Sequence, residues 1–236
     1  MKRRSSLIIS AVIISILVAC DNHREAIPVT DVDGNVYSVI TIGTQVWMAE
    51  NLKVTHYRDG SPIPNARDAA ALKTRRTGAY GIYNNNASNE VDTYGVLYNW
   101  YSAVDSRNIA PAGWHVPSDA EWKKLEIALG MSRSIANDGG FRGTNEASKL
   151  AGNADLWSYG VLESNADFGT SGFTALPGGN RVSYGDYYIG YGGHFWATTE
   201  SNSVSAWSRH LSAHDSTVWR GTTSKRFGLS IRCVRD

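Results

Sequence analysis

The clearest helix start in the chain lies in Gly113-Trp114-His115-Val116-Pro117-Ser118-Asp119-Ala120-Glu121-Trp122. Ser118 and Glu121 fit the S-x-x-E pattern of a capping box, in which each side chain accepts a hydrogen bond from the backbone of the other. The residues that follow place one apolar face on this helix: Trp122, Leu125, Ala128 and Leu129. Gly130 is positioned to end it. The pattern predicts a helix over residues 118–129.

Strand patterns lie on both sides of this helix. Asp33-Gly34-Asn35 is a hairpin signal, and a β-branched segment follows at residues 36–42. Shorter strand-like segments fill the C-terminal third, at residues 172–176, 194–199, 206–211, 217–220 and 227–235. Further helices are predicted at residues 94–104 and 146–151, with a long loop over residues 59–89. This order predicts a single α+β domain with two or three helices and long loops, in which the terminal strands (residues 36–42 and 227–235) share one mostly antiparallel sheet.

Composition excludes several classes of protein. The chain has 236 residues, 42% of them hydrophobic, with 8 Trp, 12 Tyr and 5 Phe, so it can bury enough apolar surface to fold. A total of 2 Cys excludes a disulfide scaffold. Lys and Arg number 23 against 22 Asp and Glu, so no overall charge favours nucleic acid as a partner.

The N-terminus has the pattern of an export signal. Lys2, Arg3 and Arg4 precede an apolar run over residues 7–19, which as a helix would span about 20 Å, short of the ~30 Å core of a bilayer. Leu17-Val18-Ala19-Cys20 resembles the bacterial lipobox, in which the cysteine is lipidated after cleavage. We therefore expect a signal peptide at residues 1–19, a lipidated Cys20 with a short tether at residues 20–27, and the folded domain at residues 28–236. The alternatives are an ordinary cleavage site with a chance cysteine and a buried apolar helix.

We therefore expect the lipid to anchor the protein to a membrane of a bacterial cell envelope, at the outer membrane or cell surface. Lipidation of Cys20 also leaves Cys233 without an internal partner. Phe227, Leu229, Ile231 and Cys233 alternate onto one apolar strand face, which predicts a buried, inert thiol.

Several long segments together resemble the Fibrobacter succinogenes major paralogous domain, a module of exported bacterial lipoproteins. The resemblance rests on residues 31–37, 42–52, 94–101, 113–122, 171–179, 195–200 and 232–236, and extends from about residue 27 to the end. It implies a C-type-lectin-like fold and no established activity. Members often carry a cysteine where this chain has Gly81, so the resemblance implies that a bridge to Cys233 has been lost.

The motifs of known chemistries are missing. The chain has no Glu-Pro-Asn or Trp-Asn-Asp of a calcium-dependent lectin, no H-E-x-x-H zinc motif, and no cysteine pair for a copper oxidase. His194, His210, His214 and Asp215 lie close in sequence, and the pattern favours solvated or capping histidines over a metal site or an acid–base pair. We therefore predict no catalytic residue, no metal and no cofactor.

One segment favours recognition. Residues 184–193 combine Tyr184, Tyr187, Tyr188 and Tyr191 with glycine, a composition suited to ligand contact and to stacking on sugar rings. The alternative is that these rings pack over the domain's own sheet. The sequence therefore predicts a surface binding or adhesion module for a glycan or protein ligand. An enzyme with an unrecognised active site and a structural protein of the cell envelope are the alternatives.

Overall fold

Helix α3 (Asp119–Ala128) forms where the capping box predicts it. Ser118 Oγ accepts a hydrogen bond from Glu121 N at 3.3 Å, and Glu121 Oε2 accepts one from Ser118 N at 2.8 Å. Gly130 follows the helix in the left-handed region, with a φ of +120°. The predicted helix is confirmed.

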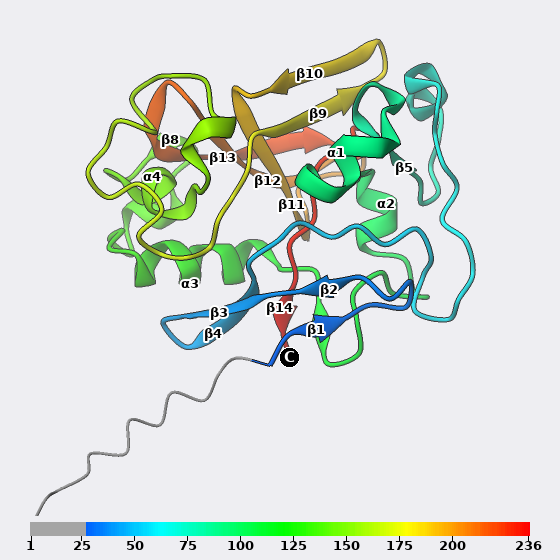
Figure 1. The fold of residues 1–236 in the computed structure, drawn as a ribbon, viewed down its shortest axis with the longest axis horizontal. Helices are drawn as coiled ribbons and strands as arrows, with labels where there is room; N and C mark the ends of the chain where they lie inside the picture. The colour runs from blue at the N-terminus through cyan, green and yellow to red at the C-terminus, as the bar shows by residue number, and fades with distance from the viewer. Residues whose placement is uncertain (1–26) are drawn as a thin grey trace, which may run out of the picture.

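The computed structural model describes residues 27–236, and Figure 1 shows its fold. The predicted signal peptide and Cys20 lie outside the described residues. None of the helices in the described range has both the length and the hydrophobicity of a membrane-spanning segment.

A six-stranded sheet has the strand order β10-β9-β11-β12-β13-β8. Its strands are β8 (Gly140–Arg142), β9 (Gly178–Val182), β10 (Gly185–Ile189), β11 (Gly192–Glu200), β12 (Ser205–Ser212) and β13 (Asp215–Ser224). Neighbours are antiparallel except for β9 and β11. The strands predicted at residues 194–199, 206–211 and 217–220 are confirmed.

A four-stranded sheet joins the two ends of the described chain, in the order β3-β4-β14-β7. Its strands are β3 (Val39–Ile42), β4 (Gln45–Met48), β7 (Trp114–His115) and β14 (Val234–Arg235). The predicted sharing of one sheet by the terminal segments is confirmed, with β4 between β3 and β14. Two ribbons complete the strands: β1 (Val29–Thr30) with β2 (Val36–Tyr37), and β5 (Tyr80–Gly81) with β6 (Leu97–Tyr98).

The helix predicted at residues 94–104 forms only in the second half of that range. Helix α1 (Ala87–Tyr94) ends at Gly95, whose φ of +76° turns the chain away, and β6 follows. Helix α2 (Trp100–Ala103) then begins with Asn99 as its N-cap. Helix α4 (Glu146–Leu150) confirms the prediction for residues 146–151. Four 3₁₀ helices complete the described elements: η1 (Ala69–Lys73), η2 (Tyr83–Asn85), η3 (Ile135–Asn137) and η4 (Ala154–Leu156).

Two predicted strands are also corrected. Residues 172–176 form no strand and contribute one isolated bridge, between Ala151 and Ala175. Residues 227–235 are a strand only at β14. The segment before it crosses the interior, where bridges from Leu229 and Ser230 replace a continuous ladder.

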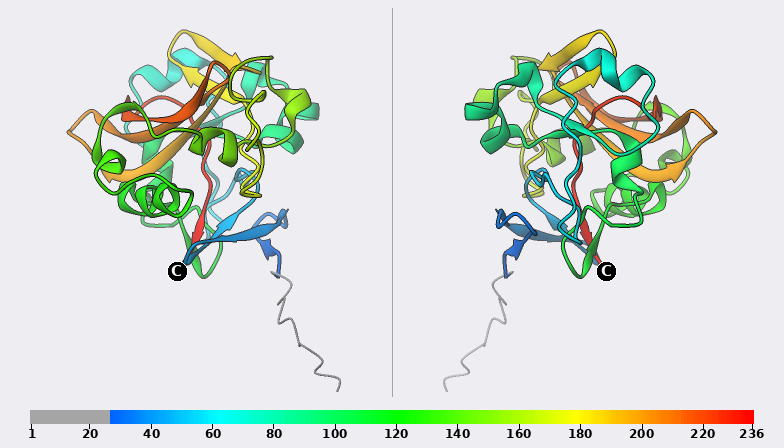
Figure 2. Two further views of the ribbon diagram at one scale, coloured as in Figure 1. Left: turned by 90° about the vertical axis from the view of Figure 1, so that its left-hand side faces the viewer. Right: turned by 90° about the vertical axis from the view of Figure 1, so that its right-hand side faces the viewer.

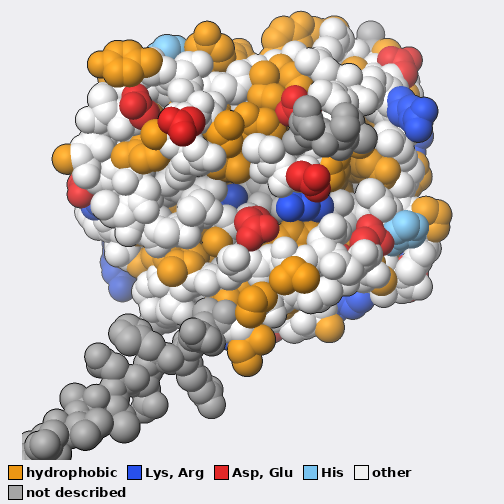
Figure 3. Space-filling view, viewed as in Figure 1, with side chains coloured by type: hydrophobic (Ala, Val, Ile, Leu, Met, Phe, Trp, Pro, Cys, Tyr) orange, Lys and Arg blue, Asp and Glu red, His pale blue; other side chains and the backbone are white. Residues whose placement is uncertain are grey.

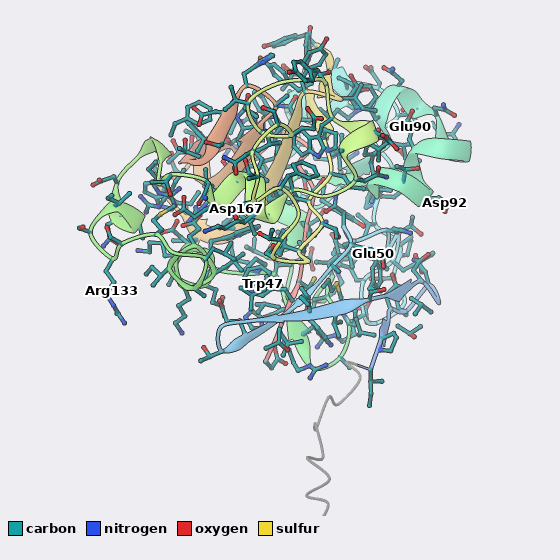
Figure 4. The ribbon with its side chains drawn as sticks, turned by 60° about the vertical axis from the view of Figure 1, so that its left-hand side comes forward. Trp47, Glu50, Glu90, Asp92, Arg133 and Asp167 are labelled. Carbon is teal, nitrogen blue, oxygen red and sulfur yellow. The ribbon has the colours of Figure 1, made fainter. Side chains whose placement is uncertain are left out.

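Large aromatic rings hold the two sheets to α3, which lies between them (Figure 1). The Trp122 ring of α3 lies 5.1 Å from that of Trp47 in β4 and 5.7 Å from that of Phe195 in β11. Figure 4 labels Trp47 where β4 approaches the helix. A second group of buried side chains contains Leu229, Ile231 and Cys233. Cys233 is free and buried, as predicted, and burial raises the pKa of its thiol.

Candidate functional site

A row of rings crosses the six-stranded sheet from strand to strand. His194 of β11 is the register partner of His210 of β12, His210 is the partner of Trp219 of β13, and Trp219 is the partner of Phe141 of β8. Register partners project from the same face of a sheet. Phe141 is 48% exposed and the other three side chains are half-buried. The four rings therefore form a strip on a solvent-accessible sheet face.

The two histidines at one end of the row stack on each other. Their ring centroids are 4.1 Å apart and their planes differ by 6°. Burial lowers the pKa of His210 to about 4 and that of His194 well below its usual value, so both rings are neutral at pH 7. Gly192 leaves room for the pair, since a Cβ there would lie 2.9 Å from His210 Nε2 and 3.1 Å from His194 Nε2.

These positions correct one prediction. His194 and His210 are half-buried and stacked on each other instead of fully solvated, because the glycine beside them lets the rings pack together. His194 Nε2 is enclosed and has no hydrogen-bond partner among the described residues. His214 is exposed, as predicted, in the turn between β12 and β13.

Tyr188 covers the histidine pair. Its ring centroid lies 5.7 Å from that of His194 and 6.5 Å from that of His210, while 56% of the residue is exposed. Its φ of +68° is uncommon for an aromatic residue, and such conformations persist only where the surroundings impose them. Gly179 of β9 permits the close approach, because a Cβ there would lie 2.3 Å from the Tyr187 carbonyl oxygen.

The structure brings together three of the four predicted tyrosines. Tyr184 and Tyr187 are 76% and 42% exposed, and their rings continue the row with centroid distances of 5.6 Å to each other and 6.3 Å from Tyr187 to Tyr188. Tyr191 is 52% exposed and has its ring contact with His214 instead, at 6.1 Å. Much of the segment forms strand β10.

Sequence reasoning missed Trp219 and Phe141. The indole of Trp219 lies over Gly221, since a Cβ there would meet the ring at 2.3 Å. Gly221 follows Trp219 by two residues on the same face of β13 and leaves the space that the ring occupies. Beside it, Ser208 is buried and its Oγ lies 2.8 Å from Oγ1 of the half-buried Thr223, while Tyr184, Tyr187 and Tyr188 carry hydroxyl groups on exposed side chains.

We define the aromatic surface by the rings that are in register or in ring contact: Phe141, Tyr184, Tyr187, Tyr188, His194, His210 and Trp219. Figure 3 shows hydrophobic side chains gathered along the end of the molecule that carries β10.

On the opposite face of β12 and β13, buried ion pairs connect these strands to helix α3. Arg209 and Arg220, the sequence neighbours of His210 and Trp219, both donate hydrogen bonds to Asp119 of α3, and Arg209 also donates to Glu126. Burial alone would raise the pKa of Asp119, but the two guanidinium groups lower it to about 2. Because alternate residues of a strand point to opposite faces, these ion pairs fix the strands beneath the aromatic rings.

No group of three or more His, Cys, Asp or Glu side chains converges on a metal-sized site within residues 27–236. Stacked, parallel imidazoles direct their nitrogen lone pairs side by side and not at one point. The arrangement can therefore offer flat apolar faces with hydroxyl groups at their edges.

A model of the Fibrobacter succinogenes major domain matches residues 40–235. The chain belongs to this family. In this Fibrobacter succinogenes major domain, the matched region contains the complete aromatic surface. No curated protein and no solved structure matches the chain, so the C-type-lectin-like fold remains an expectation.

Proposed function

We propose that this Fibrobacter succinogenes major domain is an exported, lipid-anchored module of the cell envelope that binds a glycan through its aromatic surface. The observation that carries the proposal is the row of register-paired rings from His194 to Phe141. Sugar rings present flat C–H faces that pack on aromatic rings, and hydroxyl groups that need polar partners at the ring edges.

The electrostatics of the site fit a neutral ligand. Both histidines are uncharged at pH 7, and the aromatic side chains carry no formal charge. Tyrosine and tryptophan give large contact area with few rotatable bonds, which limits the entropy lost on binding. The sheet and its buried ion pairs keep these rings in place before a ligand arrives.

A glycan array probed with the purified full chain tests the proposal. Tyr188→Ala and Trp219→Ala should each raise the Kd for a captured glycan about fivefold or more, because truncating an aromatic hot spot costs more than ~1 kcal/mol. Tyr159→Ala is the matched control, since Tyr159 is 85% exposed and lies outside the aromatic surface. Binding should survive a chelator.

Equal affinity of the parent and both variants would overturn the assignment of the surface. A protein ligand is the second candidate, favoured by the exposed Tyr184 and Tyr187, which are side chains typical of protein recognition. A protein array that captures a ligand sensitive to Tyr184→Ala, together with a blank glycan array, would select it.

A further inference from the structure

A pocket of about 130 Å³ lies outside the aromatic surface, and two arginines line it. Arg76 follows η1, Tyr101 belongs to α2, Ser203 and Val204 lie between β11 and β12, and Ser224 ends β13 just before Arg226. Ser224 is five residues beyond Trp219, or roughly 17 Å along the strand at about 3.4 Å per residue. The pocket is therefore a separate site.

The polar side chains that line this pocket are all capable of donating hydrogen bonds. They are two guanidinium groups and the hydroxyls of Tyr101, Ser203 and Ser224, with no carboxylate among them. Within residues 27–236, neither Arg76 nor Arg226 forms an ion pair, whereas Arg107 and Arg181 are each paired with an aspartate.

The carboxylate nearest in sequence to Ser203, that of Glu200, is already paired. Lys225 Nζ, next to Arg226, lies 2.6 Å from Glu200 Oε1 and also donates to the Ser203 carbonyl oxygen at 3.2 Å. The positive charges of Arg76 and Arg226 are thus left for a ligand.

We infer that this pocket binds an oxyanion, a sulfate or phosphate group that is free or esterified to a larger ligand. A guanidinium pairs with such a group through two parallel hydrogen bonds, and hydroxyls complete its coordination. Each water occupies about 30 Å³ of liquid, so the pocket holds the equivalent of about four waters, enough room for a five-atom oxyanion. The inference is independent of the aromatic surface.

Calorimetric titration of the full chain with sodium sulfate and with sodium phosphate, at ionic strength held constant with sodium chloride, tests the inference. We expect saturable binding that weakens at least tenfold in Arg226→Gln and in Arg76→Gln. Arg226→Lys should bind the oxyanion with intermediate affinity, because lysine keeps the positive charge but cannot donate two parallel hydrogen bonds. Arg133→Gln is the control and should bind like the parent; Figure 4 shows the Arg133 side chain extending away from the body of the protein.

A sulfated polysaccharide and its desulfated form separate the sources of the group, since an esterified sulfate predicts binding of the sulfated form alone. Circular dichroism verifies that each variant is folded, and Arg76, being exposed, provides a variant that leaves the core intact. Absence of saturable binding by the parent, or equal binding by the parent and an Arg76→Gln, Arg226→Gln double variant, would overturn the inference.

Discussion

His194 and His210 stack with their ring centroids 4.1 Å apart, although each ring is a base that could accept a proton in water. Burial lowers the pKa of both, to about 4 for His210. In the unfolded chain both histidines therefore take up a proton near pH 6.5, whereas in the folded chain they stay neutral at that pH. As the pH falls from 7 to 5, the free energy of unfolding should decrease by up to about 1.4 kcal/mol per pH unit for each histidine.

Urea denaturation at pH 7, 6 and 5 measures this slope. A His194→Phe, His210→Phe variant should lose the part of the slope that these two residues cause. His115 gives a control of opposite sign. Burial lowers the pKa of His115, but hydrogen bonds to Glu121 and Asp236 raise it overall. The contribution of His115 to the free energy of unfolding is present below the unfolded pKa and is lost as the pH rises. His115→Gln should therefore make the free energy of unfolding decrease more steeply on acidification. An unchanged slope in the double variant would contradict the stacking argument.

Gly221→Ala should displace the Trp219 indole without removing it, because the added Cβ would lie 2.3 Å from the ring. We expect this variant to lose glycan affinity to the same degree as Trp219→Ala, measured by the same titration. Gly139→Ala is a matched control, since the nearest atom to a Cβ there is 3.8 Å away. Parent-like affinity of Gly221→Ala would show that the flat position of the indole is not needed.

Asn51→Ala should lower the free energy of unfolding by about 2–3 kcal/mol. The Arg232 guanidinium is fully buried, burial lowers its pKa to about 9, and it donates to Asn51 Oδ1 at 2.8 and 3.2 Å. Removal of the amide leaves a buried charge with fewer partners. Asn51→Asp restores an acceptor and should be closer to the parent in urea denaturation. A loss below about 0.5 kcal/mol in Asn51→Ala would refute this role.

Truncation after Lys225 should unfold the domain as a whole. It removes β14 from between β4 and β7, together with the buried side chains of Leu229, Ile231 and Cys233. Thermal melting followed by circular dichroism measures the effect, and deletion of Asp236 alone is the control. A soluble truncated chain with the parent's melting curve would disprove the prediction.

Cys20→Ser should abolish incorporation of a labelled acyl chain and release the protein from the membrane fraction. The prediction rests on the basic segment, the apolar run and Leu17-Val18-Ala19-Cys20. Cell fractionation compares this variant with Cys233→Ser, whose thiol is buried and should not affect partitioning. Unchanged membrane association of Cys20→Ser would exclude the anchor.

Features of the fold that depend on contacts between residues close in sequence could be predicted from the sequence. Ser118 and Glu121 satisfy each other across three residues, so the start of α3 is visible in the sequence. The site differs in this respect, because Phe141 meets Trp219 only through the register of strands that are far apart in the chain. The stacking of His194 on His210 also needs Gly192, and the approach of β10 needs Gly179; the role of each glycine depends on which atoms face it. Composition could single out Tyr188 as a candidate for ligand contact, but not the histidines that it covers.

The chain enters the fold at β1, at the opposite end of the molecule from β10 (Figures 1 and 2). An acyl group on Cys20 would hold Val29 within about 30 Å of a bilayer, the reach of the intervening residues when extended. Under the proposed anchor, the β10 end would lie on the side of the domain away from its point of attachment. Such an orientation would leave the aromatic surface accessible to a ligand that does not belong to the anchoring membrane.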